Sequence, residues 1–210
     1  MIPPKCEQEL SLPCYFFDVN KNLRPASFFD LAQEIAVQGS AMVGAPDWVL
    51  KDRDIAWILS RMHVRFEQYP RLYDKVLLQT WHSGISGPLY TRDYLMLNAD
   101  GNVLIRATSS WILMEISTRS ITRVDRIFDL MSPEPQCDGR ALDANAPKLY
   151  ADIGKKLSEF KGCTVAILAP KGACTENLLK NCAALGSPST KVIKTSHGGI
   201  SLNCFVGKIF

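Results

Sequence analysis

Residues 27–43 have the sequence SFFDLAQEIAVQGSAMV and predict the central element of the fold. Helical spacing of its apolar residues predicts one helix, whose main apolar face holds Phe28, Leu31, Ala32, Ile35 and Ala36. Ser27 is the predicted N-cap, and Gly44 with Pro46 predicts the C-terminal end. More apolar side chains lie on other sides of this helix (Phe29, Val37, Met42 and Val43). We therefore expect it to be buried around most of its circumference.

The residues around this helix predict antiparallel strands. Alternating polarity and turn signals place strands at residues 55–66, 74–83, 89–98 and 103–116, with hairpin turns at 84–88 and 98–102. A first strand over residues 7–17 is expected at an edge or with a bulge, because Pro13 cannot donate to a ladder. One buried helix among antiparallel strands favours an α+β fold in which a sheet wraps around the helix.

Alternation within residues 55–66 predicts two faces of that strand. We expect Ala56, Ile58, Ser60, Met62, Val64 and Phe66 on one face, and Trp57, Leu59, Arg61, His63 and Arg65 on the other. In residues 89–98 the same reasoning places Tyr90, Arg92, Tyr94 and Met96 together.

Composition is typical of a soluble globular protein, with 47% hydrophobic and 21% charged residues. The chain has no apolar run of about 18 residues, so we expect no membrane span. The first residues lack a signal-peptide core, which predicts a cytoplasmic location. A net charge of +3 is too small to indicate nucleic-acid binding. The seven cysteines show no metal-ligand spacing, so no bound metal is expected, and Cys6, Cys14 and Cys137 are predicted to be free thiols.

Several short runs follow one another in order between residues 7 and 127. They are Tyr15-Phe16-Phe17-Asp18, residues 28–36, Trp48-Val49-Leu50, Trp57-Ile58-Leu59-Ser60-Arg61, residues 74–81 with a Thr-Trp pair, Arg92-Asp93-Tyr94, residues 107–113 and Thr118-Arg119. Together these runs resemble the first hotdog domain of the acyl-ACP thioesterases, a long central helix wrapped by an antiparallel sheet. The resemblance covers about three fifths of the chain.

The resemblance implies hydrolysis of an acyl-ACP thioester in fatty acid biosynthesis. Free fatty acid would be released by water, with acyl carrier protein as partner and without metal or organic cofactor. The family has two hotdog domains in tandem, of which the first encloses the acyl chain. The acyl-binding candidates are Phe28, Leu31, Ala32, Ile35, Trp57 and Trp111. Plain core packing explains the same residues equally well.

In this family the second domain carries a catalytic Asp-x-Asn-x-His run. We expect the chain to divide into a first domain (1–128), a linker (129–148) and a partial or aberrant second domain (149–210). Asp152, in a stretch that resembles the lead-in to the run, is a catalytic candidate, but the expected Asp, Asn and His do not follow. Composition also becomes more basic here, and we hypothesise a shifted reading frame after residue 153. A strand over residues 200–206 is among the expected C-terminal elements.

Two alternatives remain open. The chain could be a non-catalytic remnant that binds the acyl chain or its carrier. It could also be a dimeric single-hotdog enzyme that uses Asp18, although an Asx turn explains that residue as well. Arginines on the strands (Arg61, Arg65, Arg92 and Arg106) could meet the carrier or simply be solvated. The open edge of a lone hotdog sheet predicts a homodimer or an aggregation-prone monomer.

Overall fold

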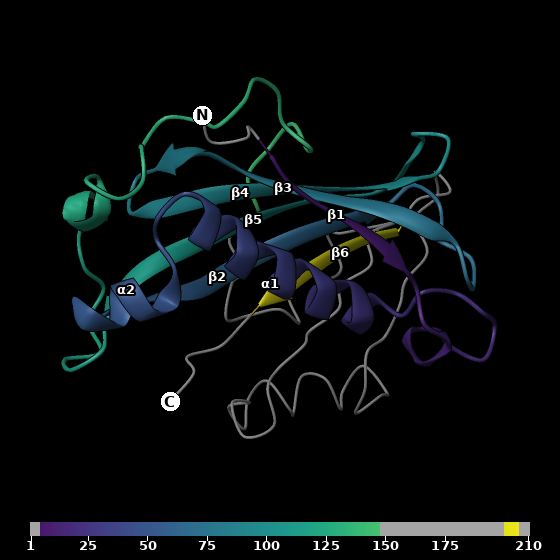
Figure 1. The fold of residues 1–210 in the computed structure, drawn as a ribbon, viewed down its shortest axis with the longest axis horizontal. Coiled ribbons are helices and arrows are strands. Elements are labelled where there is room, and N and C mark those ends of the chain that lie inside the picture. The colour runs from purple at the N-terminus through teal and green to yellow at the C-terminus, as the bar shows by residue number, and fades with distance from the viewer. Residues whose placement is uncertain (1–4, 148–199, 206–210) are drawn as a thin grey trace, which may run out of the picture.

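The computed structural model describes residues 5–147 and 200–205 of the 210-residue chain. A six-stranded antiparallel sheet has the strand order β1-β3-β4-β5-β2-β6. The strands are β1 (Cys6–Ser11), β2 (Ile55–Phe66), β3 (Lys75–Ser86), β4 (Leu89–Asn98), β5 (Val103–Glu115) and β6 (Ile200–Phe205). Helix α1 (Pro25–Met42) lies across one face of this sheet, and the short helix α2 (Asp47–Asp52) leads from it into β2 (Figure 1).

Helix α1 confirms the predicted helix but starts two residues earlier. Pro25 occupies the first turn, where its fixed φ and missing N–H suit a helix start. Arg24 is the N-cap and makes no side-chain capping bond, so the prediction of Ser27 as the cap is wrong. Ser27 is instead buried inside the first turn. The helix also keeps a solvent side, where Val37 is 42% exposed, so burial around most of the circumference is wrong too.

The strand predictions are confirmed with shifted ends. β2 and β4 have the predicted bounds, whereas β3 runs on to Ser86 and shortens the predicted turn. β1 is an edge strand, as expected, and ends at Ser11 before Pro13. A 3-10 helix, Cys14–Phe16, replaces the rest of the predicted first strand. Helix α2 was not predicted.

A β-bulge in β2 overturns the predicted faces of its first half. Pairing with β5 shifts register between Leu59 and Arg61, which leaves Ser60 as the extra residue. Before the bulge Trp57 and Leu59 pack against the core, and after it Met62, Val64 and Phe66 are buried there. The prediction that Ala56 and Ile58 share this face is wrong, because one inserted residue reverses the alternation.

Strand β6 covers part of the outer edge of β2. Residues 200–205 pair antiparallel with Arg61–Phe66. This pairing confirms the predicted strand at 200–206 to within one residue. The remaining elements expected after residue 148 lie outside the described residues, and homodimerisation stays a prediction.

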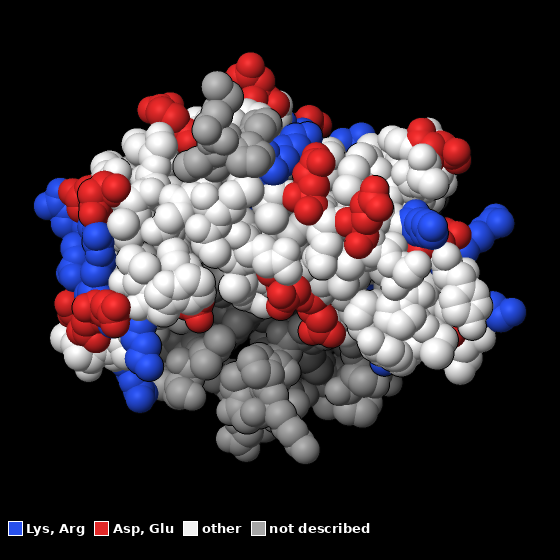
Figure 2. All heavy atoms as spheres, in the orientation of Figure 1, with Lys and Arg blue, Asp and Glu red and all other residues white. Residues whose placement is uncertain are grey.

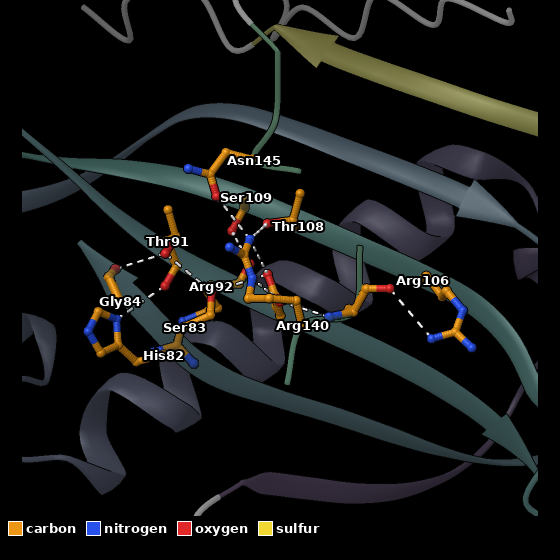
Figure 3. A network of polar contacts seen from close by, with 12 residues as sticks. His82, Ser83, Gly84, Thr91, Arg92, Arg106, Thr108, Ser109, Arg140 and Asn145 are labelled. Atoms are coloured by element: carbon orange, nitrogen blue, oxygen red, sulfur yellow. Dashed lines mark hydrogen bonds and ion pairs between the residues drawn. The ribbon is translucent and has the colours of Figure 1, made fainter. Parts of the chain in front are cut away.

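Arg140 and Ala141, which belong to the predicted linker, lie against the sheet face opposite α1. Arg92 packs beside Gly39 of α1, so the next residue of β4, Asp93, points to the opposite face. Asp93 is fully buried there and accepts hydrogen bonds from Arg140 Nε at 2.7 Å and from the Ala141 backbone N–H at 2.8 Å. Arg140 also donates to Thr108 Oγ1 at 3.1 Å and to Asn145 Oδ1 at 2.9 Å (Figure 3). These bonds hold the segment on the sheet.

Replacing Arg140 by methionine should lower the free energy of unfolding by about 3 kcal/mol, because the buried Asp93 carboxylate would lose its counter-charge. Urea denaturation of the two proteins measures this difference. The matched control is Arg123→Met, which removes an exposed ion pair with Asp125 and should change the same free energy by about 0.5 kcal/mol or less. Equal small losses in both variants would contradict the assigned role of Arg140.

Candidate functional site

A cavity of about 580 Å³ lies between the C-terminal half of α1, α2 and the sheet. The parts of α1 before and after residue 36 differ in the size of the side chains that they turn towards the sheet. Phe28 and Ile35 fill the space under the earlier part, and the ring of Phe28 packs edge-on to Phe66 at 6.0 Å. From residue 36 onwards the buried residues of the helix are small: Ala36, Gly39 and Ser40. The helix is therefore held on the sheet while a space remains beside its C-terminal half.

Aromatic side chains from three strands form much of the cavity wall. Trp57, placed on this face by the bulge in β2, packs edge-on against Tyr90 at 4.9 Å. Its Nε1 donates to Ser40 Oγ at 3.0 Å. Tyr90 Oη donates to the Val124 carbonyl at 2.6 Å, and Trp111 Nε1 donates to a neighbouring serine hydroxyl at 2.7 Å. The polar atom of each aromatic side chain is thus hydrogen-bonded, which fixes the orientation of the ring. The apolar surface of the ring then faces the cavity.

The side of the cavity at α2 is exposed to solvent. Three of its lining residues, Asp47, Trp48 and Lys51, are exposed, and Trp48 has 64% of its surface in contact with solvent. Figure 2 shows that the α1 face is largely uncharged, whereas acidic and basic side chains gather at the end of the molecule that carries α2 in Figure 1. The cavity therefore has a charged, open side and a buried floor on the sheet.

His82 belongs to the buried part of the wall and lies directly before a second bulge. Register between β3 and β4 shifts between His82 and Gly84. His82 is 1% exposed, and its Nδ1 lies 3.1 Å from the Thr91 carbonyl (Figure 3). Its Nε2 lies 3.3 Å from the Pro133 carbonyl. Burial, aided by the positive charge of Arg92, lowers the pKa of His82 to about 4, although both carbonyls act in the opposite direction. At neutral pH the imidazole is therefore uncharged.

Arg92 is the second buried polar residue of the wall. It comes from the same face of β4 as Tyr90 and is 7% exposed. The alternation of residues 89–98 placed both side chains on one face, and the packing of Arg92 beside Gly39 confirms that this face meets α1. Sequence reasoning did not connect Tyr90, His82 and Arg92 with a cavity, because the bulge of β2 and the small residues of α1 that create it have no periodic signal.

The predicted acyl-binding residues fall into two groups. Trp57 and Trp111 line the cavity. Phe28, Ala32 and Ile35 lie in the packed core, and Leu31 is partly buried against it; none of these four lines the cavity. A binding role for each of the six residues stays a prediction.

Of the two predicted catalytic carboxylates, Asp18 belongs to the described residues and does not line the cavity. Asp18 is exposed and accepts hydrogen bonds from the backbone N–H groups of Asn20 at 2.8 Å and Asn22 at 3.0 Å, the pattern of an Asx turn. The catalytic role of Asp18 stays a prediction. Asp152 lies outside the described residues.

Within residues 5–147, no group of three or more His, Cys, Asp or Glu side chains is placed to hold a metal ion. In the same part of the chain, no helix combines the length and apolar character needed to cross a membrane.

Acid should destabilise the protein partly through His82, because its pKa is about 4 in the folded state and about 6.5 when unfolded. Neutral His82 contributes its full stabilisation above pH 6.5, and this contribution falls as the pH drops towards 4. The free energy of unfolding of the wild type should therefore fall by about 3 kcal/mol more than that of His82→Gln between pH 7 and pH 4. Urea denaturation across this range measures both curves, and parallel curves would refute the assignment.

Comparison with known proteins connects this geometry to a family. The model of the acyl-ACP thioesterase N-terminal domain matches residues 3–130. Oleoyl-acyl carrier protein thioesterase 2, chloroplastic, of Arabidopsis thaliana is 29% identical over 134 residues, which are 58% of this chain and 36% of the relative. Palmitoyl-acyl carrier protein thioesterase, chloroplastic, of Cuphea hookeriana is 35% identical over 112 residues, or 51% of this chain and 25% of the relative.

Solved structures share the fold. The 12:0-ACP thioesterase from Umbellularia californica superposes with a TM-score of 0.61 at 22% identity, over 71% of this chain and 62% of that one. An acyl-ACP thioesterase from Bacteroides thetaiotaomicron gives a TM-score of 0.59 at 17% identity, over 88% and 74% of the two chains. These neighbours confirm the predicted hotdog fold.

The chain spans about a third of the length of the first curated relatives it matches. The family model nevertheless covers more than half of the chain, from the residues before β1 to those after η2 (Val124–Ile127). By this match the chain belongs to the acyl-ACP thioesterase family, of which it carries the N-terminal domain.

Proposed function

We propose that the cavity binds the acyl chain of an acyl-ACP thioester, and that the chain serves in the hydrolytic release of free fatty acid from acyl carrier protein. The observation that supports this most is the aromatic wall of Trp57, Tyr90 and Trp111 around a space of about 580 Å³, in a domain that matches this family. Acyl carrier protein as partner and a cytoplasmic location are parts of the proposal.

The wall suits an alkyl chain for a simple physical reason. Each methylene that leaves water for an apolar environment contributes about 0.8 kcal/mol, or about a fourfold change in the dissociation constant. The depth of the cavity would therefore select chain length. The thioester and its carrier would remain at the solvent-exposed side beside α2, where Trp48 and Lys51 lie.

Hydrolysis requires more than this cavity. A water molecule must be activated by a polar side chain, and donors must face the developing oxyanion. His82 is uncharged at neutral pH, but both of its ring nitrogens face backbone carbonyls. The sequence has no Asp-x-Asn-x-His run. That observation favours a second candidate function, binding of the acyl chain or carrier without hydrolysis.

Incubating the full chain with acyl-ACP separates the two candidates. Fluorescence anisotropy of a labelled carrier measures binding, and chromatography measures fatty acid release. We expect acyl-ACP to bind more tightly than the carrier without an acyl chain. Release of fatty acid supports the thioesterase, and binding without release supports the second candidate. Absence of both would overturn the proposal.

Narrowing the cavity should shorten the preferred acyl chain. Ala36 faces the cavity from α1 and is 5% exposed, so Ala36→Phe should place a ring in the acyl path. Each methylene that no longer fits should weaken binding about fourfold, so long-chain acyl-ACP should lose more affinity than short-chain acyl-ACP. Anisotropy titrations with carriers of two chain lengths measure this.

The matched control is Ala26→Phe, which makes the same change at an exposed position of the same helix. It should leave both affinities unchanged. A similar loss for short and long chains in Ala36→Phe, or the same response in Ala26→Phe, would contradict the placement of the acyl chain.

A further inference from the structure

Arg92 is a buried cation in the cavity wall without an acidic partner. Its guanidinium carries five N–H donors, yet within the described part of the chain it makes one hydrogen bond, from Nη1 to Thr80 Oγ1 at 3.4 Å. Among the same residues no carboxylate lies within ion-pair distance of it. The adjacent carboxylate, Asp93, points to the other face of the sheet and accepts hydrogen bonds from Arg140.

Such an arrangement is costly without a compensating group. Arginine and lysine are rarely fully buried unless they are paired, because an ion loses its hydration in the interior. Burial lowers the pKa of Arg92, but an arginine side chain stays protonated in proteins. The guanidinium in this wall therefore has unsatisfied N–H donors and a positive charge that a bound anion would compensate.

The position of the guanidinium is defined by the helix above it. A Cβ atom at residue 39 would lie 2.6 Å from Arg92 Nη1 and 3.3 Å from Thr80 Cγ2, so Gly39 leaves the space that the guanidinium occupies. Two aromatic residues lie on the same face of the sheet as Arg92. Tyr90 lies two residues away on β4, and Trp111 of β5 pairs with Tyr90. A cation and an apolar wall thus share one cavity.

We propose that this cavity also binds a free long-chain carboxylate, with the carboxylate against Arg92 and the alkyl chain along the aromatic wall. An inorganic anion would use only the guanidinium, and a neutral acyl chain only the wall, whereas a fatty acid matches both. Arginine binds carboxylates through two parallel N–H···O bonds, which favours this pairing. The inference rests on the proposed acyl-binding role of the cavity, and it makes free fatty acid a competitor of acyl-ACP.

The test compares dodecanoate with 1-dodecanol, which share the alkyl chain but differ in charge. Isothermal titration of the full chain, below the concentration at which either probe aggregates, should give at least about tenfold tighter binding of dodecanoate. Arg92→Met should lose this preference while still binding dodecanol, and Arg92→Lys should keep part of it. Dodecanoate should also displace acyl-ACP from the wild type more effectively than dodecanol does.

Arg71→Met is the control for removing a positive charge, because Arg71 is exposed and does not line the cavity. It should keep the wild-type preference. Without ligand, Arg92→Met should unfold at the same temperature as the wild type or higher, since removing an unpaired buried charge is not destabilising. If that variant does not fold, the wild-type comparison and Arg92→Lys still decide.

Equal binding of the acid and the alcohol by the wild type would overturn the inference and leave the proposed acyl-binding role intact. A preference retained in Arg92→Met would do the same. Failure of both probes to bind would overturn the inference together with the acyl-binding role.

Discussion

Burial of one face of α1 against the antiparallel sheet holds both the core and the cavity in place. Phe28 and Ile35 fill the space between helix and sheet and contribute the apolar surface that holds the two together. The same helix continues over the sheet with Ala36, Gly39 and Ser40, which are too small to fill that space. One helix therefore supplies both the packed core and the roof of the cavity.

An irregularity of the sheet shapes the floor of the cavity. The bulge at Ser60 brings Trp57 onto the α1 face. Without this inserted residue, strict alternation from Met62 would have turned Trp57 to the other face. His82 needs no such device, because regular alternation with Leu78 and Thr80 places it on the α1 face, and the bulge of β3 follows it. The cavity thus depends on a local departure from regular pairing as well as on the overall fold.

Regular features were predictable from the sequence. The spacing of apolar residues in α1 and the alternation in β4 gave these elements their type and position, and the ordered motifs gave the family. No glycine or proline lies next to Ser60 to indicate a bulge. The side chains of the first half of β2 were therefore predicted on the wrong faces. The start of α1 was misplaced because Ser27 looked like a better cap than Arg24.

Long-range contacts had no signal in the sequence. The ion pair of Asp93 with Arg140 joins residues far apart in the chain, and no local sequence pattern predicts that these two residues meet. The cavity was missed for a related reason. It arises from residues of α1, α2, β2, β3, β4 and β5 that converge only when the sheet forms under the helix. Trp57 and Trp111 were found because large aromatic side chains are candidates for any apolar site.

Arg92 and Asp93 are neighbours in β4 that carry opposite charges and point to opposite faces of the sheet. A slip of β4 by one residue would exchange their faces, leaving a carboxylate beneath α1 and a guanidinium facing Arg140. Both placements would be electrostatically unfavourable, so this Arg-Asp pair excludes the shifted alignment of the strand. The two charges thus favour the correct register of β4 when the sheet forms.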